Sequence, residues 1–395
     1  MKHFLALVLG LLIIPVCLSA QEEKQEGFNF EVVKEVPITS IKNQNSAGTC
    51  WGYSGLGMIE SELIRMGKGE IDLSEMYIVR KSYEDKAMKY VRMHGKTNFG
   101  QGGAFADVID CIKYYGILPE EAMTGLNYGE TTHKHSEMEA ALTGYIEGIV
   151  KNPNKKLSTA WYKGYCSILD AYLGEIPETF TYKGVEYTPE SFTKSLGINA
   201  DDYISITSFT HHPFYSTFAI EVPDNWRWAP SYNLPLDEMM QVIDNALNKG
   251  YSVAWASDVS EKGFNRKGIA VVPDADASET IGSDQANWLG LSQKERDNMI
   301  NTLKSPVPEK TITQEMRQEG FDTFETTDDH GMLIYGIAKD QNGTQYYMVK
   351  NSWGETGDYK GTWYASKAFV SYKTTNIVVH KDALPKAIKN KLKLN

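Results

Sequence analysis

Two short apolar segments near the end of the chain, residues 332–338 and 346–350, are separated by Asp-Gln-Asn-Gly at positions 340–343. Asn-Gly between two apolar segments is a strong signal for a β-hairpin, because both residues tolerate the positive φ angles of a tight turn. If these four residues form the loop, paired positions sum to 683, so that residue 332 faces residue 351. His330 and Asn351 then lie diagonally on one face, with backbones roughly 7–8 Å apart, and their side chains can meet. The spacing therefore predicts an imidazole that is oriented by an amide.

Cys50 is the candidate partner of this imidazole. Residues 44–51 (QNSAGTCW) form a polar segment, and apolar residues then recur at helical spacing as far as Gly67, so we expect Cys50 at the N-terminus of a helix. A free thiol with a pKa of about 8.5 is only about 3 % ionised at pH 7, so a nucleophilic cysteine needs a lowered pKa. The positive end of the helix and a neighbouring His330 imidazolium would both lower the pKa of Cys50.

A cysteine nucleophile also needs a proton carrier and hydrogen-bond donors for the oxyanion. His330 is the expected proton carrier, and Asn351 can accept a hydrogen bond from one imidazole nitrogen and so fix the ring. Gln44, six residues before Cys50, can donate its amide to the oxyanion beside the backbone N–H of Cys50. The predicted catalytic group is therefore Gln44, Cys50, His330 and Asn351.

The first twenty residues have the pattern of a secretory signal. Lys2 and His3 precede an apolar run over residues 4–16, and small residues end at Ala20, after which we expect cleavage. The run is shorter than the roughly 18–20 apolar residues that span a bilayer, so we expect a secreted or periplasmic protein with no membrane insertion after signal removal. Cleavage removes one of the four cysteines and leaves three, so at least one thiol is unpaired. Of these three, Cys111 and Cys166 are expected to be buried thiols.

Charge and residue spacing exclude other classes of function. With 51 acidic and 40 basic residues, the net charge of −11 argues against nucleic-acid binding as a main role. The Lys-rich tail, residues 381–395, is expected to be solvated. His211 and His212 are adjacent, and in an extended segment they would point to opposite faces and chelate poorly, so no metal or other cofactor is expected.

The periodicity of apolar residues predicts an α+β protein with two lobes, because helical patterns dominate the first part and strand patterns the last. Residues 120–250 are expected to be mostly helical, with one short strand pair across Lys183-Gly184. The expected helices begin near residues 50, 105, 138, 161 and 239, and the expected strands are 251–257, 269–272, 332–338, 346–350, 362–365 and 377–380.

Three motifs occur in the order that is typical of papain-family peptidases. Residues 44–51 (QNSAGTCW), 329–332 (DHGM) and 350–354 (KNSWG) resemble that family's nucleophile, histidine and asparagine segments. The chain is similar in particular to the bleomycin hydrolase branch, which includes bacterial aminopeptidase C. The segments that carry this closer resemblance are residues 169–177 (LDAYLGEIP), 212–215 (HPFY) and 258–259 (DV).

The resemblance implies a papain-like fold, with a helical lobe, a β-barrel-like lobe and the active cleft between them. It implies one peptidase domain over residues 21–395, with a helical insertion at about 120–250. By the same resemblance, the backbones of Gly102 and Gly103 pair with an extended substrate, and Trp353 covers the contact between histidine and asparagine. Asp329 is either a subsite residue or a solvated carboxylate. The structural cysteine common three residues before the nucleophile is replaced by Ala47, so its disulfide cannot form.

The function implied by the resemblance is acyl transfer from peptide substrates through a Cys50 thiolate, by a thiol aminopeptidase of the bleomycin hydrolase type. A papain-like endopeptidase with an open cleft and a catalytically silent papain-fold binding protein are the alternatives. In that branch the C-terminal carboxylate lies in the cleft and holds the substrate's free amine, and some members form closed rings, so a homo-oligomer also stays open. Here the tail looks shorter, and if Ala387, Ile388 and Leu392 form a helix, the chain end does not reach the cleft.

Overall fold

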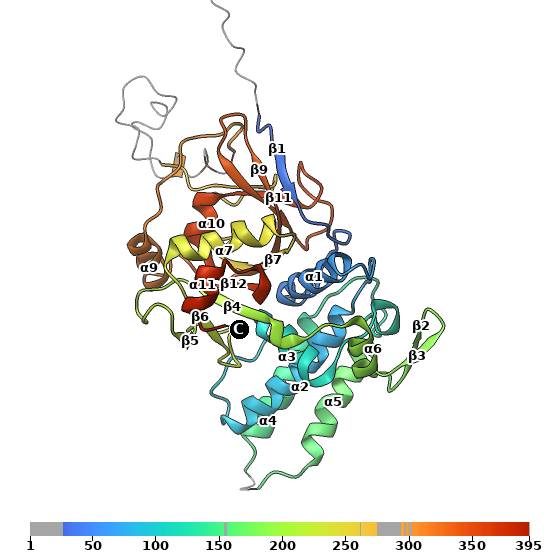
Figure 1. Ribbon diagram of the computed structural model, residues 1–395. Coiled ribbons are helices and arrows are strands. Elements are labelled where there is room, and N and C mark those ends of the chain that lie inside the picture. Colours follow the sequence, from blue (N-terminus) through green and yellow to red (C-terminus); the bar gives the residue numbers. More distant parts are fainter. Residues whose placement is uncertain are drawn as a thin grey trace, which may run out of the picture.

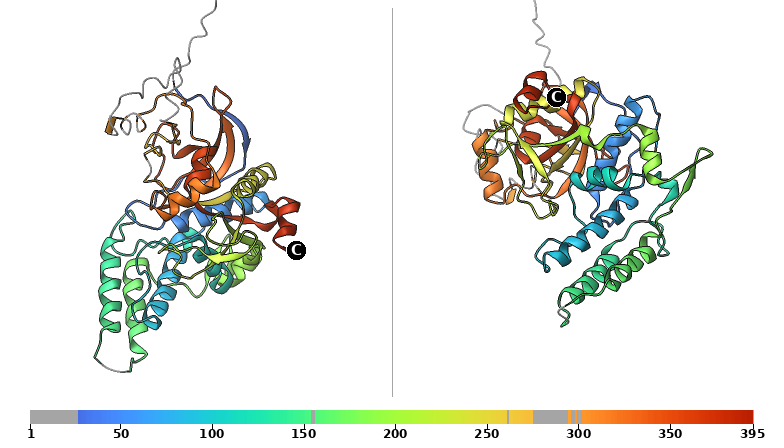
Figure 2. Two further views of the ribbon diagram at one scale, coloured as in Figure 1. Left: turned by 90° about the vertical axis from the view of Figure 1, so that its left-hand side faces the viewer. Right: turned by 60° about the horizontal axis from the view of Figure 1, so that its bottom comes forward.

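The computed structural model describes residues 27–153, 156–260, 262–274, 294–295, 298, 300 and 302–394. Ten of the described strands form one large mixed sheet, and the helices that follow the N-terminal segment gather in a second lobe below it (Figure 1). Figure 2 shows the two lobes from other sides, with α4 (Ser136–Val150) and α5 (Ala160–Leu173) extending away from the sheet. The expected α+β architecture with a helical and a strand-rich lobe is confirmed. The predicted signal over residues 1–20 lies outside the described residues.

The predicted hairpin is formed by β9 (His330–Lys339) and β10 (Gln345–Lys350). Its loop is five residues long, so the pairs next to the turn sum to 684, as in Gln345 opposite Lys339, and the predicted register is wrong there. A bulge between Met348 and Val349 then shifts the register by one, and Lys350 faces Leu333 as predicted. The error at the turn is therefore cancelled before the strands reach His330 and Asn351.

The long strand β9 is the centre of the sheet. β10 lies on one edge of β9, while β1 (Glu31–Glu35) and β7 (Val253–Ser257) share the other edge, one after the other. Across the sheet, neighbouring strands follow the order β5-β6-β4-β12-β7-β9-β10-β11-β8, and β1 pairs with β9 outside this order. The bounds of the other strands are Tyr203–Thr207 (β4), Thr217–Ala219 (β5), Pro230–Asn233 (β6), Ile269–Ala270 (β8), Thr362–Ser366 (β11) and Thr374–His380 (β12).

The expectation that residues 120–250 are mostly helical is wrong between β4 and β6. These short strands join the main sheet, because β4 pairs antiparallel with β12 and parallel with β6. Strands of three to five residues that are separated by long loops leave too little periodicity to be recognised locally. The insertion is helical over α4, α5 and α6 (Pro189–Leu196), and it also contains the predicted strand pair, β2 (Phe180–Tyr182) with β3 (Val185–Tyr187).

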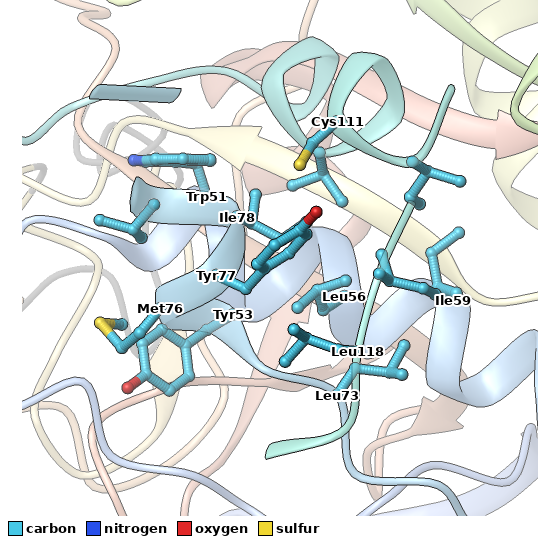
Figure 3. Packing of buried hydrophobic residues seen from close by; sticks show 14 of the residues in the cluster. Trp51, Tyr53, Leu56, Ile59, Leu73, Met76, Tyr77, Ile78, Cys111 and Leu118 are labelled. Atoms are coloured by element: carbon cyan, nitrogen blue, oxygen red, sulfur yellow. The ribbon is translucent and has the colours of Figure 1, made fainter. Parts of the chain in front are cut away.

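The helix α1 (Cys50–Arg65) joins the two lobes, and residues 51–63 are all buried. On one side it packs against α2 (Glu75–Arg92) and α3 (Phe105–Tyr115), where Trp51, Leu56 and Cys111 share a core (Figure 3). On the other side it packs against β9, where a Cβ atom on Gly331 would lie 2.8 Å from Ser54 Oγ. The close approach of α1 and β9 therefore requires a glycine directly after His330.

The helix α2 was not predicted, because charged residues interrupt its apolar stripe. Arg80 and Lys86 are nevertheless buried, and Arg80 Nη2 lies 2.7 Å from Asp170 Oδ1 of α5. The predicted helices near residues 105, 138, 161 and 239 are confirmed as α3, α4, α5 and α7 (Leu236–Asn248). The last helices are α9 (Gln314–Asp322), α10 (Lys367–Lys373) and α11 (Lys386–Lys391). In the described parts, every helix is too short or too polar to cross a membrane.

Candidate active site

Cys50 is the first residue of α1, as predicted. Its thiol is free and partly exposed, and it opens into a cavity of about 180 Å³ that His330 and Gly103 also line. The carbonyl of Cys50 accepts a hydrogen bond from Ser54 Oγ at 2.6 Å. The nucleophile of the prediction therefore lies at a helix N-terminus and faces the same space as the predicted proton carrier.

The predicted contact between His330 and Asn351 is confirmed. His330 Nε2 and Asn351 Oδ1 are 2.8 Å apart, and both residues are buried. The backbone N–H of Ser352 donates to the same Asn351 oxygen at 2.7 Å, which identifies this atom as the amide oxygen. Because that oxygen can only accept, Nε2 carries the proton, and Nδ1 of the neutral ring keeps its lone pair for the Cys50 thiol.

The indole of Trp353 stacks on the His330 ring, with centroids 4.8 Å apart and planes at 28°. Trp353 in turn packs edge-on against Phe264 and Trp363, with centroids 6.0 and 5.5 Å away. The predicted covering of the histidine by Trp353 is therefore confirmed. This aromatic layer limits the positions the imidazole can take and keeps water away from its hydrogen bond to Asn351.

Gln44 is buried beside the asparagine strand. Its Nε2 donates to the carbonyl of Ala47 at 2.6 Å, its Oε1 accepts from Ser352 Oγ, and its backbone N–H donates to the carbonyl of Ser352 at 2.8 Å. The amide nitrogen has two N–H groups, and the bond to Ala47 uses one of them. The structure thus fixes Gln44 against the segment that carries Asn351, and its donation to an oxyanion stays a prediction.

The charges around the thiol differ from the expectation. Burial raises the pKa of Cys50 to about 11, and Asp328 and Asp224 act in the same direction, while hydrogen bonds to the backbone of Gly331 and Trp51 oppose them. Burial also lowers the pKa of His330 to about 4. The predicted lowering of the thiol pKa is therefore wrong for this cleft, because burial, and to a smaller extent Asp328 and Asp224, disfavour the thiolate. Burial therefore favours the neutral thiol and the neutral imidazole, so that the proton moves from sulfur to ring during the reaction.

The two glycines that were expected to pair with substrate have different surroundings. Gly103 lines the cavity. Gly102 is covered, because a Cβ atom built on it would lie 2.1 Å from Asp224 Oδ2. The carbonyl of Gly102 accepts a hydrogen bond from Lys86 Nζ at 2.6 Å. An extended substrate can therefore approach Gly103 but finds the face of Gly102 occupied by Asp224.

Asp329 lines the cavity but is held by its neighbours. Its carboxylate accepts hydrogen bonds from the backbone N–H of Ser260 at 3.0 Å and from Thr327 Oγ1 at 2.8 Å. Although burial alone would raise the pKa of Asp329, its hydrogen bonds to Asp258 and Thr327 outweigh burial and lower it. The sequence suggested either a subsite residue or a solvated carboxylate at Asp329. Neither prediction included these hydrogen bonds.

His211 and His212 do not diverge as expected. Both Nε2 atoms lie 3.2 Å from the Glu221 carboxylate, because the pair sits in a turn and not in an extended strand. The ligand atoms of His211, His212 and Glu221 all lie within 4.8 Å of one another. The prediction that the two histidines point to opposite faces is therefore wrong. Their contacts with Glu221 hold the start of the loop that follows β5.

The remaining cysteines and the described part of the tail are not among the residues that line the cavity. Cys111 is buried and Cys166 partly buried, and both are free. The predicted tail helix is confirmed as α11, and Ile388 and Leu392 are buried in the core of the sheet lobe. Through Leu394, the last residue described, the tail supplies none of the residues that line the cavity.

Asp224 and Asp328 are cavity residues that the sequence did not indicate. Because Asp328 lies two residues before His330, the sequence could have predicted that it is close to the site, although no role was predicted for its side chain. Asp224 gave no signal, because it lies in a loop between two strands of three and four residues. It reaches the site only through the addition of β5 and β6 to the main sheet.

The chain matches the model of the Peptidase C1-like family over residues 12–287 and 298–395. It is 23 % identical over 418 residues to Aminopeptidase C of Streptococcus thermophilus, with 92 % of this chain and 85 % of that protein covered. It is 22 % identical over 399 residues to Aminopeptidase G of Lactobacillus delbrueckii subsp. lactis, covering 89 % and 83 %. Among solved structures, PepW from Lactobacillus rhamnosis has a TM-score of 0.67 at 21 % identity, covering 92 % of this chain and 84 % of PepW, which shows a shared fold.

Proposed function

Because this chain belongs to the Peptidase C1-like family and is a cysteine peptidase, we propose that it is an aminopeptidase of the bleomycin hydrolase type that trims peptides from a free N-terminus. The observation that carries this proposal is the shared cavity of Cys50 and His330, with the ring of His330 held by Asn351. The names Aminopeptidase C and Aminopeptidase G of the relatives support the choice of an exopeptidase.

The mechanism is acyl transfer in two steps. The sulfur of Cys50 attacks the carbonyl carbon while His330 Nδ1 takes the thiol proton, and the backbone N–H of Cys50 and the Gln44 amide receive the oxyanion. His330 then gives the proton to the leaving amine, and the C–N bond breaks to leave a thioester. In the second step His330 removes a proton from water, which attacks the thioester, and the proton returns to the sulfur as the acid product leaves.

An endopeptidase is the second candidate, and the position of the tail favours it. The buried side chains of Ile388 and Leu392 hold α11 in the sheet lobe, so the described part of the tail leaves the cleft unblocked. An aminopeptidase of this fold must close the cleft beyond the first residues of the substrate, and here another segment would have to do so.

Export is a further part of the proposal. Lys2, His3 and the apolar run over residues 4–16 support a cleaved signal that ends at Ala20, and the protein would then act outside the cytoplasm. Expression of the full chain in a bacterial host, followed by fractionation and N-terminal sequencing of the product, tests this. A mature protein that begins at Gln21 is expected, and an uncleaved protein that stays in the cytoplasm would contradict export.

The test of the enzymatic proposal is a product profile. The mature protein is incubated with a peptide in its free form and in its N-acetylated form, and the products are identified by mass spectrometry, with Cys50→Ala as the inactive control. Stepwise removal of N-terminal residues from the free peptide alone is expected. Equal internal cleavage of both peptides would show that the protein is an endopeptidase.

A further inference from the structure

The segment between β5 and β6, residues 220–229, lies over the cavity that Cys50 opens into. Ile220, Val222, Asp224, Asn225 and Ala229 of this segment all line the cavity that Cys50 opens into. Asn225 fixes the segment, because its Nδ2 donates to the carbonyls of Ile220 and Ala229 at 3.1 Å each. We call residues 220–229 the capping loop.

Asp224 is one of the residues through which the capping loop meets the helical lobe, together with Arg227, which pairs with Asp107 and Asp85 at 2.6 and 2.8 Å. The carboxylate of Asp224 rests on Gly102 and accepts a hydrogen bond from Asn98 Nδ2 at 2.9 Å. A substrate strand that follows the two glycines can pass Gly103 but meets Asp224 at Gly102. The capping loop therefore closes the end of the cleft on the acyl side of the scissile bond, where a longer peptide would have to continue.

Asp328 supplies a second carboxylate from the opposite wall. It lies two residues before His330, lines the same cavity and accepts a hydrogen bond from Thr375 Oγ1 at 3.3 Å. Both carboxylates are close enough to Cys50 to affect its ionisation. Lys86 Nζ donates to the carbonyls of Gly100 and Gly102 at 2.8 and 2.6 Å, and its charge partly opposes the rise in the pKa of Asp224 that burial causes. The cavity next to the nucleophile is therefore blocked at one end and lined by two acidic side chains.

We propose that Asp224 and Asp328 bind the free α-ammonium group of the peptide substrate, so that an internal pair of carboxylates confines cleavage to the N-terminus. This inference rests on the proposed aminopeptidase function and names its specificity residues. The cavity is where the acyl part of a substrate must lie, because Cys50 and His330 form its wall. A cationic amine there meets two carboxylates, whereas an N-acetylated or internal amide loses that attraction and meets the capping loop.

The same pair couples substrate binding to the nucleophile. Burial raises the pKa of Cys50, and Asp328 and Asp224 add to the rise. Among the charged neighbours of this pair, Asp329 acts on Asp328, while Lys86 and Asp107 act on Asp224. An ammonium bound between Asp224 and Asp328 cancels most of their charge, so the transfer of the thiol proton to His330 becomes easier when the correct substrate is present. A substrate without the amine leaves the sulfur facing the two acidic side chains without a cation between them.

The first test compares wild type with Asp224→Asn and Asp328→Asn on one peptide with a free and with an acetylated N-terminus. Asparagine keeps the shape of the capping loop and removes only the charge. Each variant is expected to raise KM for the free peptide and to lower the ratio of kcat/KM, free over acetylated, at least tenfold. Asp201→Asn, which removes an exposed carboxylate paired with Lys113 in the helical lobe, is the matched control and should keep the wild-type ratio.

A chain that lacks residues 394–395 is tested beside these variants and should keep the wild-type preference for free amines. An unchanged ratio in both Asn variants would overturn the inference. Loss of the preference on removing residues 394–395 would do so as well, and would assign amine binding to the chain end. A wild-type protein that cleaves acetylated peptides as well as free ones would instead refute the proposed function itself, so the two failures can be told apart.

A second readout is the alkylation of Cys50. Because the carboxylates raise the pKa of Cys50, both Asn variants should react faster with iodoacetamide at pH 7 than wild type does, whereas Cys111 and Cys166 should label at the wild-type rate. Unchanged or slower labelling of Cys50 would contradict the coupling. Faster labelling of all three cysteines would show that the variant unfolds. The faster reaction of Cys50 would then not support the coupling.

Discussion

At the scale of single residues, one oxygen of Asn351 organises the reaction centre. It accepts from His330 Nε2 and from the backbone N–H of Ser352, so it fixes both the tautomer of the imidazole and the strand that carries it. Asn351 Nδ2 is buried and has no hydrogen-bond partner among the described residues. A buried amide nitrogen without a partner is unfavourable for stability, so its presence here fits a role of the Asn351 oxygen in orienting the ring of His330.

Replacement of Asn351 should therefore be less harmful than replacement of His330. Asn351→Ala is expected to lower kcat by roughly 10–100-fold, because the ring of His330 can still carry the proton but is no longer held. His330→Ala is expected to lower kcat by about 1,000-fold or more, because no group remains to take the thiol proton. Steady-state kinetics of both variants, with circular dichroism as a check on folding, decides this. Equal and complete loss in two folded variants would contradict separate roles.

Asp328 should make the stability of the protein depend on pH. Burial raises its pKa to about 7, and Asp224 and Asp329 add to the rise, while Thr375 opposes it. Because the folded pKa lies above the unfolded value of about 3.9, the folded state holds the proton more tightly, and this contribution to stability is complete below about pH 4 and lost as the pH rises through 7.

Asp328→Asn removes that loss, so it is expected to raise the stability at pH 8 by up to about 4 kcal/mol, since each of three pKa units corresponds to about 1.4 kcal/mol, and to give little gain at pH 4. Thermal unfolding of both proteins at the two pH values is the measurement. An equal shift in Tm at pH 4 and pH 8 would show that ionisation of Asp328 is not the cause.

At the scale of elements, a buried ionic cluster holds the nucleophile helix in place. Lys42 Nζ lies 3.0 Å from Glu60 of α1 and 2.6 Å from Glu75 of α2. Glu60 also accepts from Thr39 Oγ1, which in turn accepts from Lys350 Nζ at 2.9 Å. Lys350 precedes Asn351, so the cluster connects α1, α2 and the strand that positions the histidine.

Lys42→Met should destabilise the fold strongly. Burial alone would lower the pKa of Lys42, but Glu75 and Glu60 outweigh burial and raise it, so the lysine is charged. Its loss leaves two buried carboxylates without their cation, which typically costs about 3–5 kcal/mol. Urea unfolding at pH 7 measures this, and Lys113→Met, which breaks the exposed pair with Asp201, is the control and should change little. Equal effects of the two substitutions would contradict the role of the cluster.

The hairpin and the nucleophile helix could be predicted because their signals are local. Asn-Gly and the alternation around it indicate β9 and β10, and a one-residue bulge restored the register where the loop length had been misjudged. The charged residues of α2 concealed that helix, since Arg80 and Lys86 are buried through partners that lie far away in sequence. Asp224 could not be placed either, because its position depends on β5 and β6 joining a sheet most of whose strands follow later in the chain.

At the scale of the whole molecule, two lobes meet along α1 and hold a cavity that is closed by an internal loop. The helical lobe supplies Cys50 and Gly103, and the sheet lobe supplies His330 and Asp328. The capping loop comes from strands at one end of the sheet, whereas the tail packs on α7, where Lys391 pairs with Glu238 at 2.5 Å. The arrangement separates two tasks, since the lobes perform the chemistry and the capping loop selects the end of the substrate.

The central claim is that peptide hydrolysis proceeds through an acyl group on Cys50. The most direct measurement mixes the protein with leucine 4-nitrophenyl ester, quenches with acid, and locates the acyl group by peptide mapping in wild type and in a Cys111→Ser, Cys166→Ser double variant. A burst of nitrophenol and a leucyl thioester on Cys50 in both proteins are expected, and Cys50→Ala should show neither. An acyl group on another residue, or turnover of the ester by Cys50→Ala at the wild-type rate, would contradict the account.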